Sequence, residues 1–210
     1  MIEACHPRRF AVHAIAARFL ARLAGGIALA CSLAATASPF NTTSDGADAS
    51  LMLKGHDPVA YFTVGRHALG KADIKAVHDG VTYRFSSEEN KARFLKEPGR
   101  YVPQYGGFCS NGIVYGIPWG GDPDTWKMID GKLYIFGGGA SMNYFLMDQS
   151  RNLALADRYW KDEVDGSSAL VQRYKRLIFR VPHYKTGAEL EAEWQAKQSG
   201  KPPVDNALAR

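Results

Sequence analysis

Cys109 is the residue of this 210-residue chain whose type and surroundings best suit chemistry. It lies in the segment 101–112, Tyr-Val-Pro-Gln-Tyr-Gly-Gly-Phe-Cys-Ser-Asn-Gly. Gly106 and Gly107 permit backbone conformations that other residues avoid, and they leave room for a partner to approach the sulfur. Their amides can form a concavity that favours an anion such as a thiolate. We therefore expect Cys109 at the mouth of a pocket rather than deep in apolar packing.

Residues 1–37 have the order of a secretory signal. Four arginines precede an apolar run over 23–33, and the small residues Ala-Thr-Ala follow at 35–37. The run is shorter than the about 20 apolar residues of a transmembrane helix. Arg8-Arg9-Phe10 partly matches a twin-arginine signal, whereas Ala28 to Cys31 is a poor match to a lipoprotein site. The sequence favours export, by the general secretory or the twin-arginine route, as a periplasmic or secreted protein.

Cleavage after Ala37 would remove Cys5 and Cys31 and leave Cys109 alone. The mature chain could then form no intramolecular disulfide. An unpaired thiol in an oxidising compartment is buried and inert, bound to a metal, or reactive. The residues themselves leave these three alternatives open.

The charge of the chain gives no reason to expect a nucleic acid partner. The formal net charge is +5, and residues 1–37 hold four of the 26 basic residues and one of the 21 acidic residues. Without that segment the charge falls to +2. Such a small bulk charge does not indicate nucleic acid binding.

Histidines could complete a site at Cys109. His56, His67 and His78 lack the short spacing that places two ligands on one element, and His56 is the best of them because Asp57-Pro58 sets it on a defined turn. A site of sulfur and nitrogen would favour copper or zinc, so we predict Cys109 and His56 as the metal ligands. The ligand-binding residues that we expect are Cys109, His56, Asp57, Tyr105, Gly106 and Gly107.

The patterning around these residues predicts an α+β fold. Asp79-Gly80 joins residues 74–78 to residues 81–86 in a hairpin, and Asp130-Gly131 joins 125–129 to 132–136 in a second. Short helices follow, the first of them beginning at Ser86 or Ser87. We expect a small antiparallel sheet made from the two hairpins, with short helices and a helical C-terminal extension.

Four segments are expected along the chain. Residues 1–37 are the signal peptide, and residues 38–50 are polar without apolar periodicity, which predicts a flexible leader. Residues 51–164 form the domain. Residues 165–210 form a basic helical extension with a disordered tail.

The extension begins with a predicted amphipathic helix over 168–181. Its apolar face is expected to pack on the domain, and the alternative is contact with an acidic membrane or a partner protein. A capping box at Thr186 and Glu189 predicts a further helix, which Gly200 ends.

Several separated motifs occur between about Leu51 and Glu163. They are Gly55-His56-Asp57-Pro58-Val59-Ala60-Tyr61-Phe62, residues 81–90, residues 94–101, Tyr105-Gly106-Gly107-Phe108-Cys109, Trp126-Lys127 and Asp130-Gly131-Lys132-Leu133-Tyr134. In this order the motifs resemble the YHS domain, most closely its exported bacterial branch.

The resemblance has two implications for the site. In the exported branch, the position that matches Cys109 is selenocysteine in some relatives, which implies redox or soft-metal chemistry at that atom. The small YHS domains of copper pumps and oxygenases carry cysteines in the Asp-Pro segment and near the helix start. Segments 57–60 and 86–90 of this chain hold no cysteine, so that metal site does not carry over.

Two functions follow as hypotheses. The first is an exported, non-catalytic module that binds a soft metal ion or a small ligand at Cys109. The alternative is a thiol oxidoreductase in which Cys109 is the catalytic residue and an external partner supplies the resolving thiol.

Overall fold

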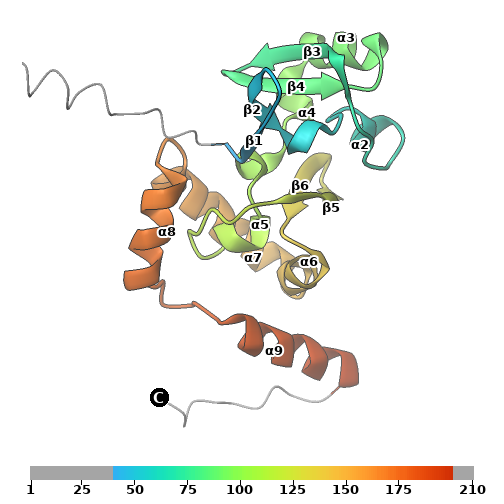
Figure 1. Ribbon diagram of the computed structural model, residues 1–210. Coiled ribbons are helices and arrows are strands. Elements are labelled where there is room, and N and C mark those ends of the chain that lie inside the picture. Colours follow the sequence, from blue (N-terminus) through green and yellow to red (C-terminus); the bar gives the residue numbers. More distant parts are fainter. Residues whose placement is uncertain (1–39, 201–210) are drawn as a thin grey trace, which may run out of the picture. The chain divides into compact units, whose positions relative to one another are not determined.

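The computed structural model describes residues 40–200 and shows an α+β fold (Figure 1). The signal expected over 1–37 and the tail expected after residue 200 lie outside the described residues. The strands are β1 (Thr42–Asp45), β2 (Asp48–Met52), β3 (Lys71–His78), β4 (Val81–Phe85), β5 (Asp122–Ile129) and β6 (Lys132–Phe136). The helices are α2 (Ala60–Thr63), α3 (Glu88–Lys96), α4 (Pro98–Tyr101), α5 (Ser110–Ile113), α6 (Gly139–Leu146), α7 (Gln149–Tyr159), α8 (Ala169–Ile178) and α9 (Gly187–Ser199).

Both expected hairpins form, but they do not share one sheet. Strands β3 and β4 belong to a four-stranded sheet of order β1-β2-β4-β3, while β5 and β6 form a separate two-stranded sheet. The free edge of β4 is occupied by β2, which pairs with it in parallel at Leu51 and Thr82. The expectation of one small antiparallel sheet is therefore wrong, because a preceding segment takes the edge that the second hairpin would need.

That preceding segment lies where the flexible leader is expected. Residues 42–52 form β1 and β2, which pair antiparallel. The buried Asp48 carboxylate accepts hydrogen bonds from Lys75 Nζ at 2.5 Å and from Arg84 Nη2 at 2.6 Å. Arg84 Nη1 also donates to Asp45 at 2.6 Å. Long-range ion pairs therefore order a polar segment that has no apolar periodicity of its own.

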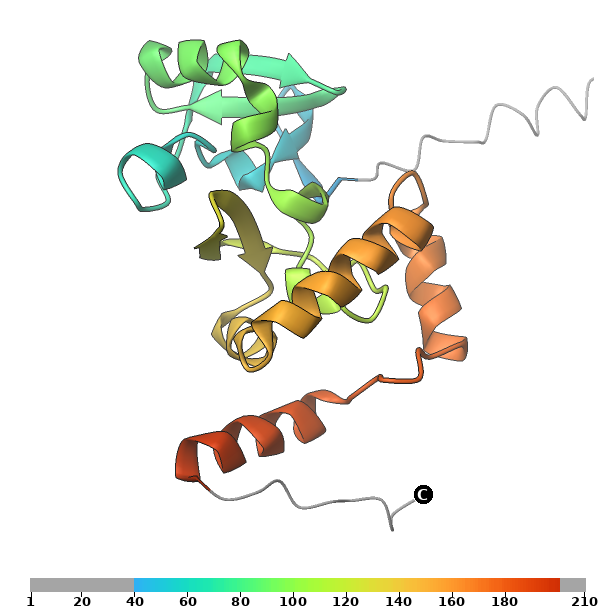
Figure 2. The ribbon, with the colours of Figure 1, turned by 180° about the vertical axis from the view of Figure 1, so that it is seen from behind.

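Strand β6 is buried on both faces and separates two apolar cores. Leu133 and Ile135 pack with Phe85 in one core, whereas Tyr134 and Phe136 pack in the other. Figures 1 and 2 show the β5–β6 hairpin between the four-stranded sheet and the helices α6 and α7. The alternation of a strand places successive side chains on opposite faces, so a single strand serves both cores.

The helix boundaries follow local capping chemistry. Helix α3 begins after Ser87, whose Oγ accepts the Asn90 N–H at 3.2 Å, which confirms the expected start. Helix α9 has the complete capping box of Thr186 and Glu189 and ends at Gly200 in a left-handed conformation, also as expected. Within residues 40–200, no helix is long and apolar enough to cross a membrane.

Helix α8 buries its polar face and exposes the apolar face that was expected to be buried. Gln172 and Arg176 are its buried residues, while Leu170, Tyr174 and Leu177 are exposed. The prediction that its apolar face packs on the domain is therefore wrong. The extension attaches instead through Val181 and Leu190, which belong to the same core as Phe145.

Asp57 is fully buried and connects three segments. Its Oδ1 accepts the Val59 N–H at 2.9 Å, which forms the turn before α2. Its Oδ2 accepts the Ser86 N–H at 2.9 Å, the Ser86 hydroxyl at 2.6 Å and Asn90 Nδ2 at 2.7 Å. A buried carboxylate is tolerated because these donors replace the water that it loses.

We predict that Asp57→Asn destabilises the protein. The amide nitrogen of Asn is a donor, and it would face either the Val59 N–H or the donors of Ser86 and Asn90. Buried donors would then lack an acceptor, so the free energy of unfolding should fall by about 3 kcal/mol. Denaturant unfolding monitored by circular dichroism measures it. Asp73→Asn is the matched control on the exposed side of β3 and should change stability by less than about 0.5 kcal/mol. Equal stability of both variants would contradict the role of Asp57.

The Asp48 ion pairs predict a loss of stability in acid. The hydrogen bonds from Lys75 and then Arg84 hold the pKa of Asp48 below its ordinary value of 3.8. A lowered folded-state pKa stabilises the fold above the unfolded-state pKa, and this contribution disappears as the pH falls through the folded-state pKa. The stability difference between the wild type and Asp48→Asn should therefore be present at neutral pH and shrink below about pH 4. A difference independent of pH would contradict this assignment.

Candidate functional site

Cys109 lies immediately before α5 and is buried, with 4% of the residue exposed. Its N–H donates to Trp119 O at 2.9 Å, and its thiol donates a weak hydrogen bond to Ser141 Oγ at 3.6 Å. Two cavities of the described part, one beside α8 and one beside α9, are lined by other residues. The expected place at a pocket mouth is wrong, because α6 and the segment before it cover the sulfur.

The covering element presents its positive end to the thiol. Ser141 lies in the first turn of α6, and its hydroxyl also donates to Gly138 O at 2.9 Å. The unpaired N–H groups at a helix N-terminus give it a partial positive charge. Cys109 therefore lies beside the first turn of α6, where its thiol donates to a hydroxyl.

Glycines let two further segments approach Cys109 closely. A Cβ atom added at Gly137 would lie 3.2 Å from Gly120 O and 3.5 Å from Cys109 Sγ. A Cβ added at Gly121 would lie 2.4 Å from Gly107 O, which real structures do not allow. The site is thus a meeting of residues 107–109, 119–121 and 137–141, each held near the sulfur by glycine.

The segment before Cys109 has a left-handed backbone. Tyr105, Gly106 and Gly107 have φ angles of 53°, 58° and 77°, which glycine adopts readily and tyrosine does not. Asn41 holds this bend, because its N–H donates to Gly106 O at 2.8 Å and its Nδ2 donates to Gly107 O at 3.0 Å. Glycine at positions 106 and 107 therefore lets the backbone take this bend without the strain that Tyr105 carries.

Tyr105 has a structural partner of its own. Its hydroxyl donates to Asp157 Oδ1 at 2.7 Å, and its ring lies against Tyr134 and Trp160. Burial, and then the hydrogen bond to Asp157, raise the pKa of Tyr105 well above its usual range. The phenol therefore stays protonated and supplies a donor, not an anionic ligand.

The two predicted metal ligands have different surroundings. His56 Nδ1 lies 2.9 Å from Leu53 O, and its Nε2 lies 3.3 Å from Asp124 Oδ1. His67 approaches the same Asp124 oxygen at 3.7 Å, so these three residues come together. The contacts of His56 and those of Cys109 share no residue. Among residues 40–200, no three His, Cys, Asp or Glu side chains form a group that could hold a metal ion.

The other residues predicted for the site also lie in separate places, some near Cys109 and some away from it. Both carboxylate oxygens of Asp57 accept hydrogen bonds, one from the turn before α2 and the other from residues at the start of α3. Asp57 therefore has a structural role. Gly106 and Gly107 belong to the segment that leads to Cys109. His78 lies at the β3–β4 turn beside Asp79, at 3.4 Å.

Sequence reasoning missed Ser141, Gly121, Gly137 and Asn41. A triple glycine at 137–139 directly after an apolar strand is a signal of close backbone approach that could have located the segment 137–141. Asn41 gave no such signal, because it lies in a polar stretch. The serine could not be paired with a cysteine 32 positions earlier without knowledge of the tertiary fold.

Comparisons of the chain with protein-family models, with curated proteins and with solved structures give no match. The fold and the site by themselves describe an α+β protein with a buried thiol at a helix N-terminus. Its resemblance to YHS domains stays a prediction.

We predict that Gly137→Ala slows alkylation of Cys109. The added methyl group would contact the sulfur and narrow the approach from this side, so the rate with iodoacetamide should fall about tenfold. Gly139→Ala is the matched control, since a Cβ there meets nothing within 4 Å. Mass spectrometry of the intact chain follows the reaction. Equal rates for the wild type and Gly137→Ala would show that reagents do not approach past residue 137.

Proposed function

We propose that this chain is an exported protein of the YHS type in which Cys109 performs thiol redox chemistry with an external partner. The observation that carries the proposal is the contact of Cys109 Sγ with Ser141 Oγ in the first turn of α6. The first turn of a helix attracts anionic groups, and the anionic thiolate is the reactive form of a cysteine. The resemblance to a branch that uses selenocysteine at the matching position supports the same chemistry.

The proposed cycle needs an oxidant and a reductant of defined class. A peroxide oxidises the Cys109 thiolate to a sulfenate, with one oxygen transferred to sulfur and water formed from the other oxygen. An external thiol then attacks the protonated sulfenic acid, releases water and forms a mixed disulfide. A second external thiol attacks that disulfide at the partner sulfur, which returns Cys109 as a thiolate and releases the partner as a disulfide.

The burial of Cys109 favours oxidation by a small peroxide before any reaction with a partner thiol. With 4% of Cys109 exposed, a small peroxide reaches the sulfur more readily than a protein thiol does. Attack by a partner thiol requires the segment 137–141 to move away from the sulfur. Gly138, with a φ angle of 146°, and the neighbouring glycines give this segment the freedom to do so.

The alternative of a module that binds copper or zinc has less support. His56 is engaged with Leu53 and Asp124, and no three-residue ligand group exists in the described residues. A soft metal ion at Cys109 would thus have to take its other ligands from a second molecule. This alternative predicts metal bound in proportion to protein and lost on substitution of Cys109.

We predict that hydrogen peroxide oxidises Cys109 in the folded protein. The chain beginning at Ser38 is suitable, because the described residues 40–200 belong to one compact unit. Dimedone traps the sulfenic acid, and intact mass spectrometry detects the product. The native chain should react at least as fast as the chain unfolded in urea. Ser141→Ala should slow the native reaction about tenfold and leave the unfolded rate unchanged, since only in the fold can this hydroxyl turn from Gly138 O and donate to the sulfur once the thiol proton has left.

Cys109→Ser is the control for dimedone specificity and should take up no label. Labelling of the wild type only after unfolding would show that Cys109 is a buried structural residue. The metal content of the purified proteins tests the binding module. One copper or zinc ion per wild-type chain, and none in Cys109→Ser, would favour that module instead.

A further inference from the structure

Helix α8 carries an exposed apolar surface. We define the α8 surface as Trp119 together with five residues of or next to the helix, and each of the six is between 53% and 71% exposed. The five residues are Leu170, Tyr174, Leu177 and Ile178 of α8 and Phe179 directly after it. Large apolar side chains gathered on one face of a monomer mark an interaction site.

Polar contacts on the opposite side hold α8 in this orientation. Gln172 Nε2 donates to Gly116 O at 3.1 Å and to Glu163 at 3.1 Å. Arg176 also donates to Glu163. Rotating α8 to bury its apolar face would expose these donors and break their hydrogen bonds. The outward direction of the apolar side chains is therefore fixed by the structure.

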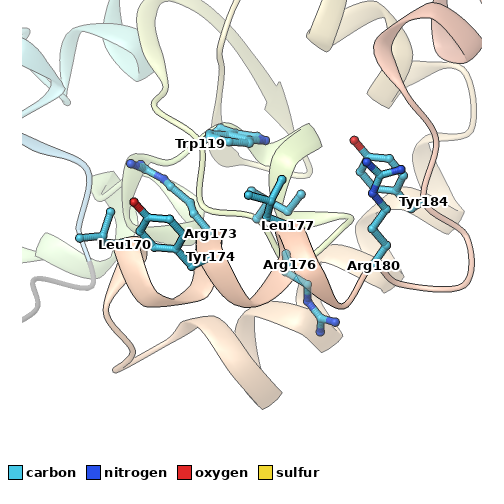
Figure 3. A pocket seen from close by; sticks show the side chains of 9 residues that line it. Trp119, Leu170, Arg173, Tyr174, Arg176, Leu177, Arg180 and Tyr184 are labelled. Carbon is cyan, nitrogen blue, oxygen red and sulfur yellow. The ribbon is translucent and has the colours of Figure 1, made fainter.

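A groove runs between α8 and the loop at 117–119. Its volume is about 240 Å³, and Trp119, Tyr174 and Leu177 line it. Figure 3 shows Tyr174 and Leu177 on the side of α8 where Trp119 lies, whereas Arg176 extends to the other side. Arg173 closes the groove, since it donates to Pro118 O at 2.9 Å and lies over the Trp119 ring at 5.6 Å.

The apolar surface lies in a strongly basic part of the chain. Residues 166–188 contain five Lys or Arg and no Asp or Glu. Lys175 and Arg176 pair with Glu163, but within residues 40–200 neither Arg173 nor Arg180 forms an ion pair. Arg180 instead lies over the Tyr184 ring at 4.6 Å. The face thus offers guanidinium groups beside aromatic and aliphatic side chains.

We propose that the α8 surface docks on an anionic phospholipid membrane, with α8 lying in the plane of the interface. Amphipathic helices bind membranes through an apolar face that enters the acyl boundary and basic side chains that meet anionic headgroups. Tryptophan, tyrosine and arginine suit that boundary because each has an apolar body and a polar end. This inference is independent of the proposed thiol chemistry.

A second copy of the chain fits this surface less well. A symmetric dimer through α8 would bring Arg173 and Arg180 of one copy close to those of the other, and like charges at an interface are repulsive. An anionic membrane supplies the opposite charge to all of these groups at once. The charge complementarity therefore selects the lipid surface.

Cosedimentation with vesicles tests the proposal. The chain should begin at Ser38, because the apolar run over 23–33 would bind vesicles by itself. We expect it to bind vesicles of phosphatidylglycerol mixed with phosphatidylcholine, to bind less as salt increases, and to bind phosphatidylcholine alone weakly. The double variant Leu177→Ser with Ile178→Ser should lose affinity at least about tenfold. Both side chains are more than 60% exposed, so this variant should fold.

Two matched controls separate the surface from general effects. Leu95→Ser removes an exposed leucine from α3 and should bind as the wild type does. Arg180→Gln should weaken binding to anionic vesicles, whereas Arg100→Gln on α4 should not. The fluorescence of Trp119 should shift to shorter wavelength on binding, and the Trp119→Phe variant should show a smaller shift.

Three results would overturn the proposal. The wild type could stay in the supernatant with anionic vesicles. The double variant could bind vesicles as tightly as the wild type. A dimer that forms in solution and that the double variant lacks, without vesicle binding, would assign the α8 surface to a second copy.

Discussion

Strand β6 must bury both of its faces, and the rest of the described structure is arranged around that requirement. Leu133 and Ile135 need one apolar core and Tyr134 and Phe136 need another, so sheet and helices pack on opposite sides of one hairpin. The strand also positions the thiol site. Ile135 O accepts the Ser110 hydroxyl at 3.0 Å, directly after Cys109, and Gly137 follows the end of the strand next to the sulfur. The core and the candidate site therefore depend on the same strand.

Two buried carboxylates fix what apolar packing leaves undetermined. Asp57 joins the turn before α2 to the beginning of α3, and Asp48 joins β2 to Lys75 of β3 and Arg84 of β4. Apolar contacts favour burial but have little directional preference, whereas a carboxylate with several donors accepts only a narrow range of positions. These contacts explain why polar residues, and not only the apolar pattern, decide the sheet order.

The parts of the fold that sequence predicted are those set by local chemistry. Both Asp-Gly hairpins, the Ser87 cap and the Thr186 capping box depend on residues within a few positions of one another. The parts that sequence missed depend on distant partners. Strands β1 and β2 need the charges of β3 and β4, and the orientation of α8 depends on Glu163 and on the carbonyl of Gly116. For the same reason, the exposure of Cys109 was predicted wrongly while its glycine-rich surroundings were identified correctly.

Trp119 links the thiol site to the α8 surface and limits what its substitution can show. Its carbonyl oxygen accepts the Cys109 N–H, while its ring lies beneath Arg173 in the groove. Gly112 must stay small here, because an added Cβ would lie 3.0 Å from the Trp119 ring and 2.5 Å from Ile117 O. Trp119 therefore contacts the thiol site through its backbone and the α8 surface through its ring. Residues such as Ser141 and Leu177, which belong to one site each, are the ones that distinguish thiol chemistry from membrane docking.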